Sequence, residues 1–273
     1  HMDPAVLQRE CEVLENCLSQ ISTWLSANML KFNSDKTEIL LLGSPRQLRI
    51  FPLSSLSVAG TDVQISKGPI RNLGGTFDSY LTMAPQVNNM AKSAAFHLRN
   101  IGYVRKMLTV ETTKCLIQSL VISRLDYGNS LLCGTSDVLL SRLQRIHNSA
   151  ARLITRMSRE HITPVLMSLH WLPLKARIQY KVLLLVYKAL HSLAPAYICE
   201  LLTNYQPPRS LRSASKDLLV EPRANQATVG DRAFSVYAPR LWNRVPSPIR
   251  QAITVSQFKN SLKTHLFQTA YQQ

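Results

Sequence analysis

A long run of helical periodicity, from Pro85 to about Ile198, constrains the fold of this chain more than any other feature. Apolar residues recur in it at steps of three and four, beginning with Val87, Met90, Ala91, Ala94, Leu98 and Ile101. That spacing puts them along one face of a helix, which must bury that face against another element. The run is far longer than one globular helix, so we expect several helices packed together.

Local signals divide the run into separate helices. Thr109 is the residue type of a helix N-cap, and Asp126-Tyr-Gly128 interrupts the apolar pattern that follows it. Further helices are predicted over residues 137–158 and 175–192. The central part of the chain is therefore expected to be helical.

The N-terminal part combines one helix with short strands. Residues 4–29 carry an apolar stripe at helical spacing, with Trp24 as a large anchor near the end. Strands are predicted over residues 38–42, over 56–58 and 63–65 around a hairpin-like turn, and over 71–78. The paired glycines Gly74 and Gly75 indicate a bulge or the close approach of another backbone. A small antiparallel sheet following a helix is predicted, so the fold class is α+β.

Beyond Tyr205 the pattern is looser, because six prolines interrupt it. A short strand over residues 218–220 and a last helix capped by Ser256 are predicted, while residues 234–242 form either a short helix or irregular structure. Trp242 lies between Arg240 and Arg244. It either stacks on a nucleic-acid base or is buried and locks the C-terminal segment.

Charge is distributed unevenly along the chain. There are 32 lysines and arginines against 16 acids, a net charge of +16. Residues 1–137 hold 13 basic and 11 acidic side chains, whereas residues 138–273 hold 19 and five, a net charge of +14. A field of one sign over half a protein indicates a polyanionic partner, with nucleic acid first and an anionic membrane surface second.

The helix predicted over residues 138–159 concentrates this charge. Successive helical residues turn about 100°, so five arginines fall within a narrow sector: Arg142, Arg145, Arg152, Arg156 and Arg159. The opposite side is predicted to hold Leu139, Leu143, Ile146, Ala150, Leu153 and Met157. A row of guanidinium groups pairs with phosphate oxygens and can follow a nucleic-acid backbone. The alternative is a basic face that is exposed only to water. Such a face would ordinarily have acidic side chains to pair with, but Glu160 is the only acid between residues 138 and 199.

Several kinds of site are not predicted. The five cysteines are scattered without metal-ligand spacing, which indicates a reducing compartment and no metal site. His161, His170 and His191 fit no metal template. No nucleophile elbow and no Walker-type glycine loop is present. No apolar run approaches the roughly 20 residues of a membrane span, so no membrane partner is expected.

Short tracts spread over residues 5–268 resemble one protein family. Trp24-Leu-Ser-Ala-Asn-Met-Leu-Lys-Phe-Asn-Ser-Asp-Lys-Thr-Glu38 is similar to the tract that follows the catalytic strand pair in reverse transcriptases of LINE-type (non-LTR) retrotransposons, the jockey-like elements among them. Asn72-Leu-Gly-Gly-Thr-Phe-Asp78 resembles the palm motif that leads into the primer grip. Residues 125–128 and 143–154 resemble the thumb, and residues 170–178, 211–213 and 241–246 resemble the region beyond it.

The resemblance implies an origin in an RNA-directed DNA polymerase. It implies that Lys36 is the candidate general acid that protonates the leaving pyrophosphate. It also implies that Leu73, Gly74, Gly75, Thr76 and Phe77 help to position the primer end. The resemblance divides the chain into a partial palm over residues 3–84, a helical thumb over 85–200 and a basic C-terminal region over 201–273.

The chain departs from the family in one decisive respect. Family enzymes hold two metal ions with aspartates that belong before residue 5, and Asp35, Asp62 and Asp78 do not match those positions. No cofactor is therefore expected on this chain, and Mg²⁺ is implied only for the intact parent enzyme. We predict that the chain alone is an inactive polymerase that retains binding of RNA, DNA or an RNA–DNA hybrid.

The sequence also allows alternative functions. A domesticated, non-enzymatic protein-interaction module is the main alternative, and the excised half of an active enzyme is a third. The missing N-terminal part of the polymerase is a further expected partner. An intracellular location, in nucleus and cytoplasm, is expected.

Overall fold

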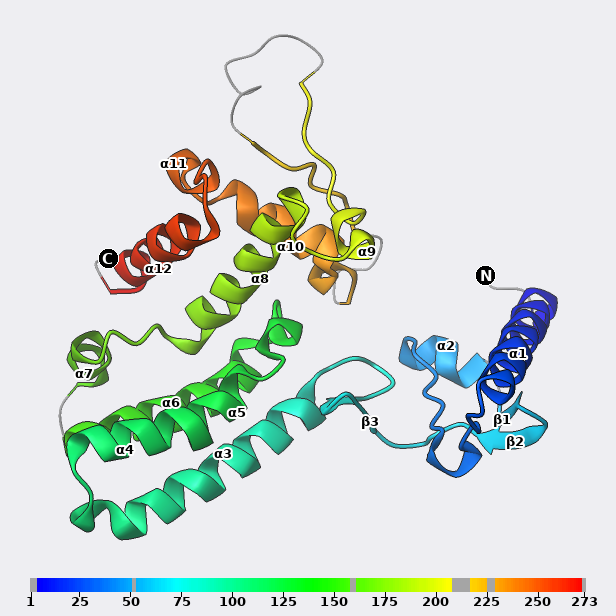
Figure 1. Ribbon diagram of the computed structural model, residues 1–273, viewed down its shortest axis with the longest axis horizontal. Coiled ribbons are helices and arrows are strands. Elements are labelled where there is room, and N and C mark those ends of the chain that lie inside the picture. The colour runs from blue at the N-terminus through cyan, green and yellow to red at the C-terminus, as the bar shows by residue number, and fades with distance from the viewer. Residues whose placement is uncertain (1–3, 51–52, 158–160, 208–216, 225–228, 272–273) are drawn as a thin grey trace. The chain divides into compact units, whose positions relative to one another are not determined.

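The computed structural model describes residues 4–50, 53–157, 161–207, 217–224 and 229–271. It is mixed α+β, rich in helix, with two small antiparallel sheets, which confirms the predicted fold class at this level (Figure 1). The chain forms two compact units, His1–Gln86 and Val87–Gln273. The first predicted domain boundary, after residue 84, lies beside the junction of these units. The second, after residue 200, lies inside the second unit.

In the first unit, helix α1 (Pro4–Ala27) packs on the hairpin of β1 (Ser55–Val58) and β2 (Thr61–Gln64). The Glu15 carboxylate accepts a 2.8 Å hydrogen bond from Ser57 N, so this residue faces the hairpin. Trp24 is 62% exposed, and its predicted role as an anchor is wrong. The adjacent Leu25 is partly buried, and a turn of about 100° per residue carries Trp24 off that face.

The β1–β2 hairpin confirms two of the predicted strands. Its register pairs Leu56 with Val63, and both side chains are buried. The two-residue turn Ala59-Gly60 has φ of 53° and 79°. Positive φ at both central positions is the turn geometry that matches the twist of paired strands, and glycine adopts it without steric cost.

A second hairpin replaces the strand predicted over residues 71–78. β3 (Ile70–Asn72) and β4 (Gly75–Phe77) pair in antiparallel fashion. Leu73 and Gly74 lie between them with φ of 47° and 80°, so the chain reverses there. The prediction of one strand was wrong because the glycines allow a turn rather than a bulge. The described sheets are accordingly two separate pairs rather than one sheet.

The strand predicted over residues 38–42 is reduced to a single bridge. Ile39 pairs in parallel with Ile65, and Ser66 N donates to Ile39 O at 2.8 Å. Gly43 N donates instead to Ser79 O at 3.0 Å, and α2 (Pro45–Ile50) begins soon after. An apolar run extends as a strand only where a neighbour takes up its backbone groups, and here only Ile39 has such a partner.

The second unit is helical. Its long helices are α3 (Ala84–Val104, which begins at the junction), α6 (Asp137–Thr155), α8 (Leu174–Leu190) and α12 (Val255–Tyr271). Shorter α-helices are α4 (Val110–Leu116), α5 (Ser123–Asp126), α7 (Ile162–Ser168), α9 (Ala196–Cys199), α10 (Phe234–Asn243) and α11 (Ser247–Arg250). Short 3₁₀ helices are η2 (Arg105–Met107), η4 (Asn129–Leu132) and η5 (Gly230–Arg232), and a π-helical segment, η3 (Ile117–Ile122), joins α4 to α5.

Most predicted helix boundaries agree with this structure. Thr109 Oγ1 accepts a 3.1 Å hydrogen bond from Thr112 N, which confirms the N-cap of α4. Gly128, with φ of 60°, follows the end of α5. Two local predictions are wrong: Thr254 rather than Ser256 accepts the capping hydrogen bond, from Gln257 N, and the strand over 218–220 is a single bridge from Leu219 to Asn204.

The C-terminal helices share a core with α8. Tyr187 stacks on Phe258 of α12 with ring centroids 4.3 Å apart, and its hydroxyl donates to Ala252 O at 2.8 Å. Trp242 in α10 is 1% exposed, and its Nε1 donates to Asp217 O at 2.8 Å. Trp242 is therefore a buried anchor, and a side chain so enclosed cannot stack on a base.

Candidate functional site

Lys36 lies in a short turn, η1 (Ser34–Lys36), and its side chain is exposed. Its backbone N donates to Asn33 Oδ1 at 3.1 Å, and Thr37 Oγ1 donates to Asn33 O at 2.8 Å. Asparagine side chains close turns in this way. None of the ion pairs among the described residues includes Lys36.

The primer-grip-like residues 73–77 form the turn and second strand of the β3–β4 hairpin. Leu73 is 88% exposed at the tip. Thr76 N donates to Oε1 of the buried Gln86 at 2.9 Å, which ties the hairpin to the first turn of α3. A Cβ at Gly75 would lie 3.1 Å from the Phe77 ring, so the ring would have to shift. A hydrogen bond from Gly43 N to Ser79 O joins the segment that follows the Lys36 tract to the segment that follows the hairpin.

The three aspartates weighed against the family pattern, Asp35, Asp62 and Asp78, lie at separate places in the structure. No group of three or more His, Cys, Asp or Glu among the described residues could hold a metal ion. Asp78 instead caps the next turn, since its two carboxylate oxygens accept from Thr82 N at 3.1 Å and Met83 N at 3.2 Å. Asp35 and Asp62 are exposed on separate elements.

Helix α6 carries only part of the predicted arginine row. Arg142 and Arg145 are exposed on it, and Arg152 is half-buried. The helix ends at Thr155, and Arg156 follows with φ of 59°, so the prediction that the helix continues through residue 158 is wrong there. A left-handed residue terminates a helix because its carbonyl points out of the repeat. Arg159 lies outside the described residues.

The buried face of α6 is rotated relative to the prediction. The buried residues are Leu140, Leu143, His147, Ala150, Ala151 and Ile154. Of the apolar set predicted from sequence, only Leu143 and Ala150 are buried, and Met157 is 40% exposed. The reason is that α6 packs against α4, η3, α7 and α8, whose combined surface accepts a histidine and small alanines. With this rotation, Arg142 and Arg145 lie on the exposed side of α6.

The arginines of α6 have no described acidic partner. The ion pairs among the described residues are Lys175–Asp137, Arg177–Asp126 and Arg240–Asp231. Arg142 has a neutral side-chain partner, since its Nη1 donates to Asn88 Oδ1 of α3 at 2.7 Å. The positive charge of this face is therefore left for solvent or for an external anion.

Buried Arg105 closes the C-terminal end of α6. Its guanidinium donates to Leu153 O, Ile154 O and Leu108 O at 2.8 to 2.9 Å. These bonds satisfy carbonyls that a helix end leaves without partners, and they put a cation at the negative end of the helix dipole. Burial, aided by the charge of Arg156, lowers the pKa of Arg105, although arginine remains charged at neutral pH.

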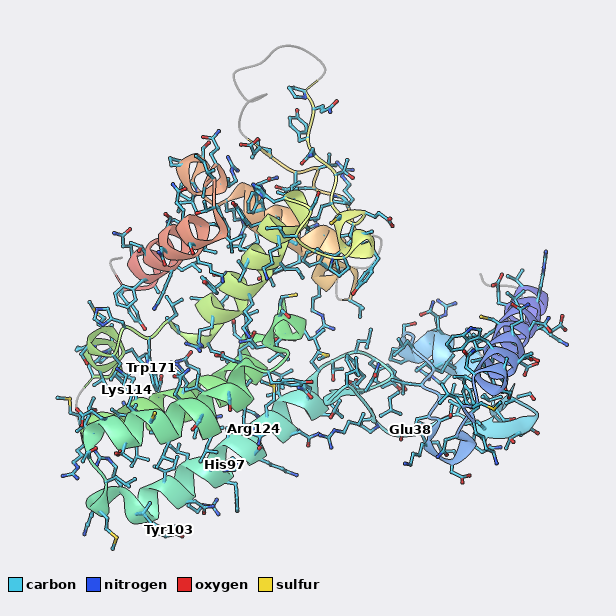
Figure 2. All side chains as sticks on the ribbon, viewed as in Figure 1. Glu38, His97, Tyr103, Lys114, Arg124 and Trp171 are labelled. Carbon is cyan, nitrogen blue, oxygen red and sulfur yellow. The ribbon has the colours of Figure 1, made fainter. Side chains whose placement is uncertain are left out.

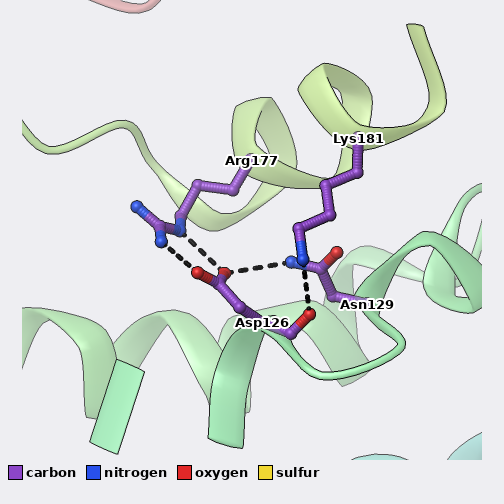
Figure 3. Close-up of polar contacts among 4 residues, drawn as sticks. All are labelled: Asp126, Asn129, Arg177 and Lys181. Atoms are coloured by element: carbon purple, nitrogen blue, oxygen red, sulfur yellow. Dashed lines mark hydrogen bonds and ion pairs between the residues drawn. The ribbon is translucent and has the colours of Figure 1, made fainter. Parts of the chain in front are cut away.

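Asp126, at the end of α5, is the centre of a polar cluster that fastens α8 (Figure 3). Arg177 donates through Nε to Asp126 Oδ1 at 3.0 Å and through Nη2 to Asp126 Oδ2. Asn129 Nδ2 also donates to Oδ1, and Lys181 Nζ donates to Asp126 O at 2.9 Å. Both partners of the ion pair are about one-fifth exposed, so the cluster positions α8 rather than offering a site.

His147 of α6 is buried and packs against Trp171, which is labelled in Figure 2 and lies in the segment that joins α7 to α8. Its ring lies 5.0 Å from Trp171, centroid to centroid. Burial, together with the charge of Arg177 and against that of Asp126, lowers the pKa of His147 to about 3. The neighbouring Gln144 Oε1 accepts a 2.7 Å hydrogen bond from Leu174 N. Together these contacts hold α6 in one rotational setting, which is what exposes its arginines.

Sequence reasoning missed His147, Arg177, Lys181 and Arg105 as parts of this framework. One available signal was Asp126, the only acid between Glu111 and Asp137, because an isolated acid in a basic helical region requires a cationic partner. The identity of that partner, 51 residues away for Arg177, is set by packing.

No protein-family model matches the chain, and comparison with the curated proteins and with the solved structures gives no match. In addition, no helix in the described part of the chain is long and apolar enough to cross a membrane.

Proposed function

We propose that this chain binds RNA or an RNA–DNA hybrid through phosphate contacts made by the exposed arginines of α6. The observation that carries the proposal is the combination of Arg142 and Arg145, exposed and without a described acidic partner, on the side of α6 opposite its core. Two exposed guanidinium groups three residues apart on one helix can each pair with phosphate oxygens. The net charge of +14 over residues 138–273 adds a long-range attraction to the same partner.

The proposed origin is the palm end, thumb and C-terminal region of a LINE-type reverse transcriptase. The tracts around Lys36 and Leu73–Phe77 support it through their resemblance to that family. Because Asp35, Asp62 and Asp78 do not match the metal-holding positions of that family, we propose that the chain alone does not polymerise DNA. Primer extension by the purified chain with Mg²⁺ would contradict this.

Phosphate contacts position a nucleic acid without reading its sequence. We therefore propose that binding at α6 has little sequence preference and a strong salt dependence. Each neutralised phosphate adds about 0.9 to the slope of log affinity against log salt on a duplex.

The test replaces Arg142 and Arg145 with glutamine and titrates a labelled RNA–DNA hybrid at several salt concentrations. We expect the affinity at low salt to fall and the salt slope to decrease by about 2, one for each lost phosphate contact. The matched control replaces Arg223 and Arg244, two exposed arginines outside α6, in the same way. An unchanged affinity and slope in the α6 variant, or an equal effect in the control, would remove α6 from the proposal.

A protein-interaction module is the second candidate, and one observation favours it. Helix α1 carries four apolar side chains that are exposed to solvent, with their exposed fractions in parentheses: Val13 (57%), Leu14 (46%), Ile21 (43%) and Trp24 (62%). An apolar interface holds its affinity as salt rises, whereas phosphate binding weakens steeply. Binding that resists salt and is lost on replacing Trp24 and Ile21 with serine would favour this second function.

A further inference from the structure

Helix α3 has a second exposed surface of a different chemical kind. Its buried side chains, Val87, Met90, Ala94 and Ile101, fall on one side of the helix. The other side carries Lys92, Phe96, Arg99 and Tyr103, all four of them exposed. At about 100° per residue these four lie within a narrow sector. We call these four residues the α3 stripe.

The α3 stripe alternates cations with aromatic rings. Phe96 is 57% exposed and Tyr103 is 78% exposed, although large aromatic side chains are ordinarily buried. Tyr103 lies near the C-terminal end of α3 (Figure 2). The rings are two helical turns apart, about 10 Å along the axis, with Arg99 between them.

No acid opposes these charges along the helix. The sequence from Pro85 to Val110 contains no aspartate or glutamate. Neither Lys92 nor Arg99 takes part in an ion pair among the described residues. The stripe therefore offers positive charge without a described acidic partner beside two exposed aromatic rings. The ring of Phe96 also contacts His97 in a T-shaped arrangement, with centroids 5.4 Å apart.

We infer that the α3 stripe binds unpaired nucleotides, with bases stacked on Phe96 and Tyr103 and phosphates held by Lys92 and Arg99. Aromatic rings interleaved with cations bind single strands without sequence preference, because every base has a face that stacks. A duplex keeps its bases stacked on one another, so it can use the cations of the stripe but not its rings. The stripe thus selects single strands, whereas the arginines of α6 do not.

The stripe adjoins the arginine face of α6. Asn88 lies one turn before Lys92 on the same side of α3, and its Oδ1 accepts the 2.7 Å hydrogen bond from Arg142 Nη1. This contact joins the two surfaces within one compact unit. A nucleic acid with a paired part and an unpaired part is the ligand that engages both.

The test replaces Phe96 and Tyr103 with leucine in the whole chain, which removes the aromatic faces and keeps the charge. Labelled oligouridylate and an RNA–DNA hybrid of the same length are titrated at one salt concentration. We expect affinity for the single strand to fall about tenfold or more, since loss of stacking costs roughly that much for one base. Affinity for the hybrid is expected to change less than about twofold.

Three further measurements test the inference. Replacing both rings with tryptophan preserves a stacking face and is expected to retain single-strand affinity. Leucine in place of the exposed Tyr197 of α9 is the matched control and is expected to have no effect. A fluorescent base analogue in the oligonucleotide should be quenched by the unmodified chain and not by the leucine variant.

Three results would overturn the inference: unchanged single-strand affinity in the leucine variant, equal losses for single strand and hybrid, or binding of anionic vesicles without binding of oligouridylate. The experiments distinguish a failure of this inference from a failure of the role proposed for α6. A smaller salt slope in the variant of Arg142 and Arg145 reports on α6, while the preference for single strands reports on the α3 stripe.

Discussion

Arg105 and Leu153 are 48 residues apart in the sequence, yet Arg105 Nε donates a 2.8 Å hydrogen bond to Leu153 O. The same guanidinium reaches Ile154 O and Leu108 O. One buried cation thus joins the end of α6 to the turn that precedes α4. The end of the helix that carries the exposed arginines is therefore closed by an arginine that is not itself available to a ligand.

Replacing Arg105 with methionine should destabilise the second unit. The change keeps most of the apolar stem but leaves three carbonyls without their charged donor, and we expect a loss of about 2 kcal/mol in the free energy of unfolding. Urea denaturation followed by circular dichroism measures it. Methionine at the adjacent, exposed Lys106 is the control and should cost little. Equal midpoints for the two variants would contradict the role given to Arg105.

Replacing Asp126 with asparagine should also destabilise the fold. The ion pair with Arg177 is largely shielded from water, so removing one partner leaves a cation without its charge partner. We expect a loss of about 2 kcal/mol, less than the roughly 3–5 kcal/mol for a fully buried pair, because both groups keep some exposure. The control is Asp137→Asn, whose pair with Lys175 is exposed and should contribute about 0.5 kcal/mol or less. A control that costs as much as Asp126→Asn would show that the cluster does not fasten α8.

The free energy of unfolding should decrease as the pH is lowered, because His147 is buried in its neutral form. Its pKa in the folded chain is lowered to about 3, below the ordinary value of 6.5, so between these values the unfolded chain binds the extra proton. Lowering the pH from 6.5 therefore favours unfolding, by about 1.4 kcal/mol for each pH unit from this group. Urea denaturation at pH 7 and pH 5 should show a smaller fall for His147→Phe than for the unmodified chain. Parallel pH profiles would exclude His147 as the source.

Trp242→Phe should lower stability without changing nucleic-acid affinity. Phenylalanine retains much of the contact with Phe258, whose ring centroid lies 5.8 Å away, but loses the hydrogen bond to Asp217 O. We expect a cost of about 1–2 kcal/mol from the smaller ring and the unpaired carbonyl. Binding is measured with the labelled hybrid at a temperature where both proteins are folded. A fall in affinity with unchanged stability would revive the stacking alternative for Trp242.

Features that depend on neighbouring residues could be predicted from the sequence. The helix of α1, the N-cap at Thr109, the break at Gly128 and the turn at Ala59-Gly60 all follow from local backbone preferences and side-chain hydrogen bonds. The excess of positive charge in the C-terminal half, and the exposure of Arg142 and Arg145, could be predicted in the same way. These properties need no knowledge of distant contacts.

The tertiary structure decided the features that require a partner far along the chain. Residues 38–42 are apolar enough for a strand, but only Ile39 finds a bridge partner, because pairing requires another backbone at the right distance. The rotation of α6 that buries His147 and Ala151 depends on the combined surface of four other elements. The spacing of apolar residues within α6 carries no information about that surface. Packing likewise determines that Arg177 pairs with Asp126 and that Arg105 binds the carbonyls at the end of α6. The attraction between a cation and an acid or a carbonyl is strong only where folding excludes water from between them. The sequence alone therefore determined which residues carry the charge, and the fold decided which of them face outward to meet a ligand.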